Sequence, residues 1–312
     1  MAGDFSPMLA PVDEPMLGPP RNIGLLFIKS LLAQRHKYFL TAAVQLAIST
    51  LFPGRFAVVP IATLTLTMLT THLIDRLTPP QTPPPAHMLS VVPGRASALL
   101  PHADGTWGST PSNHPLVVFN LGVQFNHPRG QMCPYAKELA EKFALMSRDL
   151  LSRREELGLL SVTNWTGLDL QPASGAGPDT LLMSYYFRDV ESIHRFAHEE
   201  MHREAWDWYN SVKPHHIGIF HETFVVPAHG HESIYVNCRP FMLGASLVKL
   251  DDEKKTDGKT DGGKGNEASK KSRDDGVARW RNLLVSADHV ALNRQWQRLN
   301  RDANGVPRER TV

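Results

Sequence analysis

Between residues 114 and 226 the sequence predicts a strand, a helix and a strand, and then the same three elements again. This repeat limits the fold more than any other feature. The alternating run PLVVFNLGVQF predicts a first strand, with Val117, Phe119 and Leu121 on one apolar face. Apolar residues at helical spacing then predict a helix over 135–156, closed by Gly158. Two strands, a second helix and a last strand follow. We therefore predict an α+β, ferredoxin-like domain over residues 114–250.

Composition places this domain in a broad class of proteins. The chain has 312 residues, of which 42% are hydrophobic, enough for one substantial domain with appendages. A formal net charge of +2 and no dominant basic patch argue against a nucleic-acid partner. Cys133 and Cys238 are the two cysteines, and neither has a partner cysteine at metal-ligand spacing. A reduced, intracellular protein without a disulfide framework is therefore expected.

Four segments outside the predicted domain differ from it in composition. Residues 1–24 are rich in proline, glycine and methionine; they carry no signal peptide pattern and are expected to be flexible. Residues 78–113 begin with a run of prolines that favours an extended linker. Residues 251–276 have almost no apolar side chains and are expected to be disordered. Residues 277–312 become amphipathic again, which predicts one or two C-terminal helices and a tail.

Residues 25–77 contain two charge-free apolar runs, 38–52 and 56–74, separated by a break at 53–55. The second run is about long enough to cross a bilayer, whereas the first is short. We predict membrane attachment by a helical hairpin, or by one span plus an interfacial helix. Basic residues flank the pair on its outer sides, which places both ends in the cytosol. The alternative is a buried helical hairpin of a soluble domain.

Histidines gather in the second half of the predicted domain. Three of them, His194, His198 and His202, are four residues apart and share one stripe of the second helix. This stripe flanks the predicted core stripe, which consists of Val190, Ile193, Ala197, Met201, Ala205 and Trp208. His221 lies in the last strand, near His215 and His216. Because imidazole moves protons near neutral pH, we predict that these histidines border a pocket and act there as acids or bases. The alternative is half-exposed histidines bonded to water.

Helix geometry argues against a metal ion held by this stripe. The first and third histidines are about 12 Å apart along a straight helix, so the three cannot bind one ion. The first histidine pair, HRFAH, lacks the HExxH pattern of helix-bound zinc sites, whereas the second, HEEMH, matches it in letters. We predict no metal and no resident cofactor. A haem bound by one of these histidines is the alternative.

Other candidate pocket residues lie on the strands. Asn120 lies on the first strand and Trp165 on the second, although a lone Asn or Trp is usually structural. Alternation along the last strand leaves open whether His221 or Glu222 points into the pocket. Arg188, at the end of the third strand, can hold an anionic group or pair with a carboxylate.

Three further residues are predicted to bind substrate at the edge of the pocket. Trp206 shares the stripe of the histidines on the second helix. Tyr235 and Asn237 follow the last strand, on an apolar background. The alternative for these two polar groups is a capping turn.

The segments VVFNLGVQFN, SIHRFAHEEMHREAWDWYN and HIGIFHETFVV resemble the antibiotic-biosynthesis-monooxygenase-like superfamily of dimeric α/β-barrel proteins. The nearest branch is the fungal monooxygenase-like proteins of fumagillin-type biosynthetic clusters, and the resemblance covers residues 110–245. It implies a homodimer that pairs sheet to sheet and oxygenates its substrate with O2, without metal or flavin. His198 or His202 would be the base, with Asn120, Trp165 and His221 positioning the substrate.

We therefore predict a membrane-tethered monooxygenase of secondary metabolism. Its substrate would be small, apolar and conjugated, derived from a polyketide or a terpenoid. The expected location is an intracellular membrane, such as the endoplasmic reticulum, with the catalytic domain facing the cytosol. The first alternative is a haem-binding enzyme of the same fold, such as a dehydratase. The second is a non-catalytic, membrane-bound interaction protein.

Overall fold

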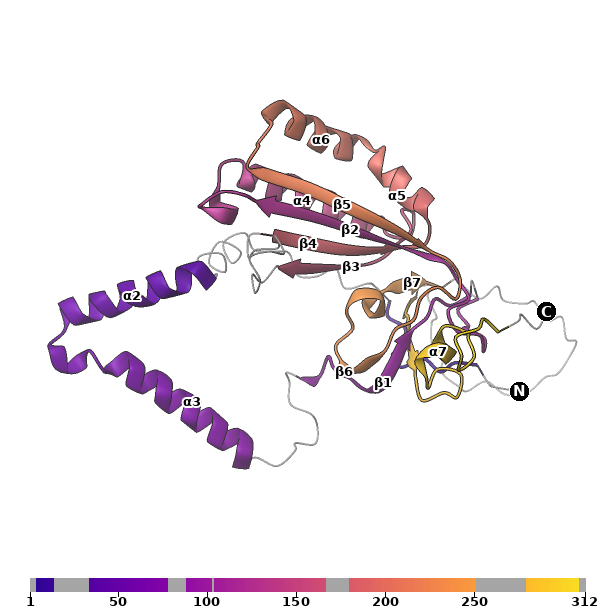
Figure 1. Ribbon diagram of the computed structural model, residues 1–312, viewed down its shortest axis with the longest axis horizontal. Helices are drawn as coiled ribbons and strands as arrows, with labels where there is room; N and C mark the ends of the chain where they lie inside the picture. The colour runs from indigo at the N-terminus through magenta and orange to yellow at the C-terminus, as the bar shows by residue number, and fades with distance from the viewer. Residues whose placement is uncertain are drawn as a thin grey trace, which may run out of the picture. The chain divides into compact units, whose positions relative to one another are not determined.

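The computed structural model describes residues 4–13, 34–77, 88–102, 104–166, 180–250 and 279–308. Contacts between residues divide the chain into two compact units, which we describe separately (Figure 1). The larger unit contains the sheets and both terminal segments, and the smaller unit contains the apolar hairpin. The segment 251–276, predicted to be disordered, lies outside the described residues.

The larger unit is built on a four-stranded sheet. Its strands are β2 Leu116–Phe125, β3 Leu159–Thr166, β4 Thr180–Phe187 and β5 Ile217–Val226. They lie in the order β3-β4-β2-β5, and all three pairings are antiparallel. Helices follow the first and third of these strands, so the predicted α+β, ferredoxin-like topology is confirmed.

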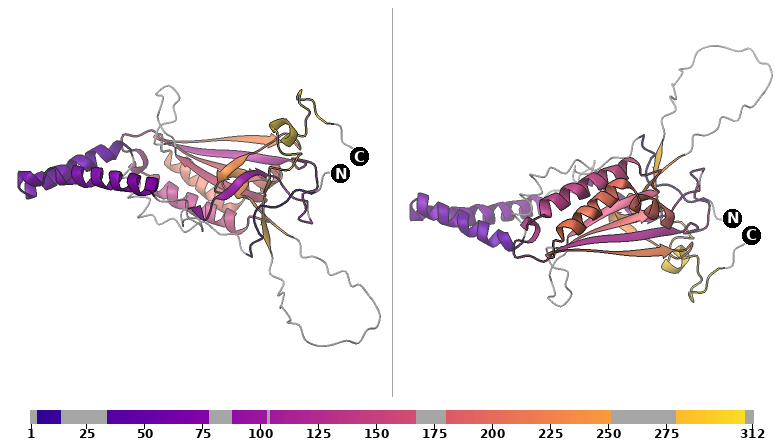
Figure 2. Two further views of the ribbon diagram at one scale, coloured as in Figure 1. Left: turned by 90° about the horizontal axis from the view of Figure 1, so that it is seen from below. Right: turned by 90° about the horizontal axis from the view of Figure 1, so that it is seen from above.

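Helices α4 Ala136–Ser152, α5 Val190–Ala197 and α6 Glu200–Val212 cover one face of this sheet (Figures 1 and 2). Alternation turns the apolar side of β2 that contains Val117, Phe119 and Leu121 toward them. The cluster between helices and sheet includes the fully buried Leu157 and Phe187. Each such side chain contributes about 1.5–3 kcal/mol by leaving water.

The opposite face is half covered by a second sheet. It consists of β6 Tyr235–Cys238, β1 Val92–Ala98 and β9 Leu284–Ser286, paired antiparallel in the order β6-β1-β9. One buried cluster joins Leu116 and Tyr186 of the first sheet to residues of the second. The rest of this face, toward the other ends of β2 and β4, has no such cover among the described residues of the chain.

Two predictions on the flanking segments are wrong. Part of the predicted linker 78–113 is folded, because it contains β1 and the buried side chains of Leu99 and Trp107. The predicted C-terminal helices are replaced by two short strands and turns: β8 Trp280–Asn282 pairs with β7 Leu247–Lys249, and β9 follows. The helix α7 Gln295–Arg298 is one turn long. In both segments, pairing with strands distant in sequence overrides the local pattern.

The N-terminal segment is also folded where the structure describes it, which corrects the predicted flexibility of residues 1–24. Residues 4–13 run antiparallel to β9 and β8 along their free side. Met8 N donates to Leu284 O at 2.9 Å, and Trp280 N donates to Val12 O at 2.7 Å. The Phe5 side chain is 3% exposed and packs with Leu99 and Trp107.

This docking predicts that Phe5→Ala destabilises the larger unit. Removing a fully buried phenylalanine ring costs about 3–5 kcal/mol, because the cavity does not refill. Val12→Ala is the matched control on the same segment, since Val12 is 42% exposed. Denaturant unfolding of both variants measures the difference. A Phe5→Ala variant as stable as the wild type would contradict the docking of this segment.

The loop of residues 227–234, which follows β5, is hydrogen-bonded to two segments of the larger unit that are distant in sequence. His229 N donates to Ser112 O at 2.6 Å, and Arg298 Nε donates to Glu232 Oε2 at 2.6 Å. His231 lies between these contacts, and neither of its ring nitrogens has a hydrogen-bond partner among the described residues. Burial, followed by the neighbouring His229 and His114, lowers the pKa of His231 to about 4.

We expect this buried histidine to make the protein less stable in mild acid. Its pKa is about 6.5 in the unfolded chain and about 4 in the folded one, so only the unfolded state binds the proton between these values. The free energy of unfolding should fall by roughly 3 kcal/mol between pH 6.5 and pH 4. In His231→Phe this loss should largely disappear, whereas the exposed His215→Phe should retain it. Equal pH dependence in both variants would contradict the prediction.

The smaller unit contains two helices, α2 Gln34–Leu51 and α3 Val59–Leu77, joined through η1 Gly54–Phe56. The Gln45 side chain donates to Ala57 O at 3.1 Å across the turn. One stretch, Gly54–Ile74, is long and apolar enough to cross a membrane: it has 21 residues and a mean hydropathy of 1.7. None of its most apolar window is buried.

Candidate active site

The histidine-bearing helix is broken in the middle, so the prediction of one continuous helix is wrong. Asp189 begins α5 by accepting from Ser192 N at 2.7 Å. α5 ends at the cap residue His198, and Glu199 has an extended backbone with φ −72° and ψ 152° before α6 begins. The three histidines therefore do not form a single stripe.

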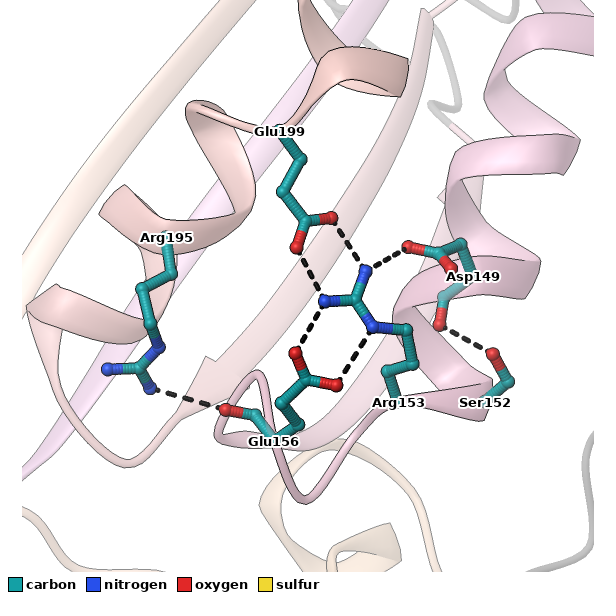
Figure 3. Close-up of polar contacts among 6 residues, drawn as sticks. All are labelled: Asp149, Ser152, Arg153, Glu156, Arg195 and Glu199. Carbon is teal, nitrogen blue, oxygen red and sulfur yellow. Dashed lines mark hydrogen bonds and ion pairs between the residues drawn. The ribbon is translucent and has the colours of Figure 1, made fainter.

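Arg153, which follows α4, binds Glu199 at this break (Figure 3). Its two terminal nitrogens donate to both Glu199 oxygens at 2.6 and 2.8 Å. It also donates twice to Glu156, at 2.6 and 2.9 Å, and once to Asp149 at 3.1 Å. The hydrogen bonds that Arg153 donates to Glu156 and Glu199 raise the pKa of Arg153 above its usual range. This cluster, which we call the Arg153 clamp, ties the break to the end of α4.

The break also rotates α6 relative to the predicted core stripe. The half-buried side chains of α6 include His202, Ala205, Tyr209 and Val212, at helical spacing. Met201, which was predicted to be in the core, is 38% exposed. His202 therefore belongs to the inward stripe of α6 and not to its border.

His202 has the surroundings of a neutral imidazole. Its ring meets the edge of the Phe196 ring, with the centroids 5.7 Å apart. Burial lowers the pKa of His202, and nearby His198 lowers it further, against the opposing effect of the Ala197 backbone. The imidazole is therefore uncharged at pH 7 and able to accept a proton.

His198 lies at the break itself and is exposed. Its Nδ1 is 2.7 Å from His194 O, so this nitrogen donates to the backbone of the last turn of α5. The contact fixes the ring beside His202 and leaves the other ring nitrogen at the surface.

His221 lies on the helix-facing side of β5, which answers the choice between His221 and Glu222. In the β2–β5 ladder His221 is opposite Leu121, which packs under the helices. Its ring is 5.5 Å from that of Phe119, between the ring centroids. Glu222 is opposite Asn120 and therefore lies on the other face.

His202 and His221 lie at a similar level along the sheet. Tyr209 donates its hydroxyl to Ile217 O at 2.5 Å and so fixes α6 over the start of β5. The two elements run in opposite directions (Figure 1). His202 precedes Tyr209 by seven residues, which is about 10 Å along the axis of α6. His221 follows Ile217 by four residues, which is about 13 Å along β5 and in the same direction in space. Both therefore lie at about the level of the α5–α6 break.

This edge of the sheet is open to solvent. β5 is an edge strand, and its helix-facing side chains His221, Thr223 and Val225 are exposed. A shallow hollow in the described part of the chain lies at the Arg153 clamp, between α4 and α6. The residues that line it are Asp149, Arg153, Glu199, Glu200, Met201 and Glu204. We define the candidate site as the edge containing His202, His221, Phe196 and Phe119.

Asn120 and Trp165 do not join these histidines, which corrects the prediction of one pocket. Asn120 is opposite Ser184 on β4, and Trp165 is opposite Leu182. Both therefore lie on the sheet face away from the helices, because side chains alternate along each strand. A four-stranded sheet separates them from His202.

On that second face, Trp165 and Tyr235 are linked by a residue that the sequence did not single out. Phe241 meets the Trp165 ring edge at 6.5 Å and the Tyr235 ring edge at 5.5 Å, between centroids. The Tyr235 hydroxyl accepts from Gly244 N at 3.0 Å, and burial raises its pKa to about 12. Asn237 Oδ1 accepts from Gly94 N at 2.9 Å and joins β6 to β1. Tyr235 and Asn237 thus have structural partners in the second sheet.

Arg188 and Trp206 have other partners than the candidate site, although Trp206 follows His202 by one turn of α6. Arg188 pairs with Glu155 at 3.2 Å, the alternative that the sequence left open. Trp206 is half exposed and stacks on Tyr209, with the ring centroids 5.6 Å apart. Sequence reasoning missed Phe119, Phe196 and Arg153. Phe119 was visible in the alternation of β2, whereas the other two depend on the break.

No group of three or more His, Cys, Asp or Glu side chains among the described residues is arranged to hold a metal ion. The donor set at the candidate site is two imidazoles with aromatic neighbours. Its chemistry is that of proton transfer beside an apolar surface.

The fold and this site define a class: a ferredoxin-like α+β protein with histidines at the helix-covered face of its sheet. A family model described as "Monooxygenase af470-like" matches residues 116–243. "Monooxygenase af470" of Aspergillus fumigatus is 37% identical over 302 residues, covering 97% of this chain and 100% of that protein. The chain belongs to the monooxygenase af470-like family.

Two similar solved structures match part of the chain. An aldoxime dehydratase in complex with butyraldoxime is 15% identical, with a TM-score of 0.36; the match covers 48% of this chain and 38% of that one. A putative antibiotic biosynthesis monooxygenase from Deinococcus radiodurans is 13% identical, with a TM-score of 0.24; the match covers 34% of this chain and 89% of that one.

Proposed function

We propose that this protein is a monooxygenase of secondary metabolism that oxygenates a small, apolar, conjugated substrate with O2. Membership of the monooxygenase af470-like family supports the reaction class. The observation that carries the site is His202, a half-buried imidazole with a lowered pKa beside the Phe196 ring. A neutral imidazole against an aromatic surface suits a substrate that is apolar and carries one acidic C–H bond.

In this reaction His202 takes a proton from a CH2 group whose negative charge is delocalised over the conjugated system. The electron-rich substrate then reduces O2. Conversion of CH2 and O2 to C=O and H2O balances, because the substrate supplies all four electrons. His221 lies on the same face and donates a hydrogen bond to the developing oxyanion.

We also propose that the protein is attached to an intracellular membrane, such as the endoplasmic reticulum, with the larger unit facing the cytosol. The exposed apolar surface of α3 supports attachment, because apolar patches of this size favour lipid or a partner. An apolar substrate partitions into the same membrane, which brings it close to the enzyme.

Gene deletion in the source organism tests the function even while the substrate is unidentified. We expect one apolar metabolite to disappear and its precursor to accumulate. Growth under ¹⁸O2 should label the missing product with one oxygen atom more than the precursor carries. Wild-type and His194→Ala genes should restore the product, and His202→Ala should not. No change in any apolar metabolite would overturn the proposal.

We propose that two copies pair through the uncovered half of the sheet face. Trp165 and Phe220 are large aromatic residues exposed on this half-face, and Phe224 is exposed next to it on the edge strand, opposite Val118. Glu222 is a lone charge among the described β2–β5 positions of this sheet face. Phe220 lies across Gly122, since a Cβ on that glycine would be 2.0 Å from the ring. A flat aromatic surface with few charges is typical of the core of a subunit interface.

Phe224→Lys should dissociate this dimer. Phe224 is 50% exposed on the proposed interface, and its neighbour Val225 is 65% exposed on the opposite face. A buried aromatic residue contributes about 2 kcal/mol, and it occurs twice in a symmetric dimer, so the dissociation constant should rise about 100-fold or more. Sedimentation in mild detergent measures the change, with Val225→Lys as the matched control. A monomeric wild type, or equal effects of both variants, would refute pairing through this face.

A further inference from the structure

The two chain segments that flank the hairpin belong to one β structure. Residues 4–13 pair with one side of β9, where Pro7 is opposite Val285. β1 pairs with the other side of β9, where Ser97 is opposite the same Val285. The chain therefore leaves the larger unit after residue 13 and returns to it at Val92, with α2 and α3 between.

This arrangement limits how often the chain crosses a membrane. If the segment between residues 13 and 92 crossed once, the two strands beside β9 would lie on opposite sides of the bilayer. Because they are hydrogen-bonded to one strand, the number of crossings is even. A single span with an interfacial helix, which the sequence left open, is therefore incompatible with the folded larger unit.

We propose that α2 and α3 cross the bilayer together as a two-pass hairpin, with the turn at Gly54–Phe56 on the far side. This topology rests on the membrane attachment proposed above and adds the number of crossings. α3 has 19 residues and is about 28 Å long, close to the hydrocarbon thickness of about 30 Å. The apolar run 38–52 is shorter, about 22 Å, which tilting and local thinning of the bilayer accommodate.

The surface of α3 fits lipid on all sides. Its exposed apolar side chains point in several directions around the axis, among them Ile61, Leu66, Leu69 and Ile74. Two of its threonine hydroxyls bond within the helix: Thr67 donates to Thr63 O at 2.8 Å, and Thr71 donates to Thr67 O at 2.9 Å. A helix lying flat on the membrane would leave half of this apolar surface in water.

Arg55 distinguishes a full crossing from shallow insertion. It lies in the turn between the helices, with its guanidinium 5.2 Å from the centre of the Phe56 ring. If the hairpin entered only one leaflet, this charge would lie near the bilayer centre, where it costs at least about 2.5–3.5 kcal/mol. A two-pass hairpin puts Arg55 at the far headgroups, while His72 and Arg76 lie at the near side.

Single-cysteine labelling of the full-length protein in sealed microsomes tests this topology. Cys238→Ser removes the partly exposed thiol, and the buried Cys133 remains as an unreactive background. Gly54→Cys marks the turn, where a new Cβ meets nothing within 4 Å. Val290→Cys, at a position 67% exposed, marks the larger unit. The probe is a membrane-impermeant maleimide with a mass tag.

We expect the cysteine at 290 to be labelled in sealed microsomes. The cysteine at 54 should be labelled only after a pore-forming toxin admits the maleimide through an intact bilayer. Labelling of position 54 in sealed microsomes would overturn the topology, since the turn would then lie on the near side. Labelling only in detergent would overturn it too, because the turn would be embedded. Release of the protein by alkaline carbonate would instead refute the membrane attachment itself.

Discussion

His202→Ala is expected to lower the turnover number by roughly 10²–10⁴-fold, the usual contribution of a positioned general base. The physical reason is the loss of the half-buried, neutral imidazole beside Phe196. His194→Ala is the matched control, because His194 is exposed and lies on α5, before the break. Product formation by the two variants in complemented deletion strains, or with the purified substrate, measures the difference.

The pH profile separates a base from a residue that only supports the fold. The base works in its neutral form, and burial lowers the pKa of His202 below 6.5. Activity should therefore be level near pH 7 and fall on the acid side, with its midpoint below pH 6.5. His202→Gln should lose this acid limb together with most of the activity. Retention of the full rate in both His202 variants would refute the assignment.

Gly158→Ala is expected to destabilise the larger unit by about 3 kcal/mol or more. Gly158 has a φ of 65°, in the left-handed region, where a Cβ costs about 1–2 kcal/mol. A new Cβ would also lie 2.1 Å from Ser192 Oγ, so that the start of α5 would have to shift. Steric overlap of this kind typically costs a further 1–3 kcal/mol, by the order of magnitude seen in overpacked cores.

Two companion variants divide this cost into its parts. Gly94→Ala carries the same kind of positive φ, 80°, but a Cβ there meets nothing within 4 Å, so it should cost only about 1 kcal/mol. Adding Ser192→Gly to Gly158→Ala removes the overlap and should recover the steric part of the loss. Denaturant unfolding measures all three. Equal losses in Gly158→Ala and Gly94→Ala would show that the contact with Ser192 has no effect.

Alternation along the strands was sufficient to predict the strands of the sheet and the more apolar side of β2. Side chains on a strand alternate with a period of two, so the apolar positions of β2 identified the face that α4 and α5 cover. The same rule left one choice open on β5, because both His221 and Glu222 have apolar neighbours. The β2–β5 register decides it, and register depends on the partner strand.

The break between α5 and α6 could not be predicted from the local pattern. The spacing of histidines and apolar residues continues across His198 and Glu199 without a proline or glycine. What accompanies the break is an ion pair with Arg153, at a separation of 46 residues. Strands β8 and β9 escaped prediction for a related reason: each has three residues, and its pairing partner is elsewhere in the chain.

The strands on either side of β9 point in the same direction, so the connections to the hairpin start from opposite ends of the second sheet. Residue 13 leaves beside Trp280, whereas Val92 enters beyond Ser286. The connections 14–33 and 78–91 reach at most about 70 Å and 50 Å when fully extended. Because both connections start on the larger unit, the shorter of them sets the greatest distance that can separate α3 from Val92.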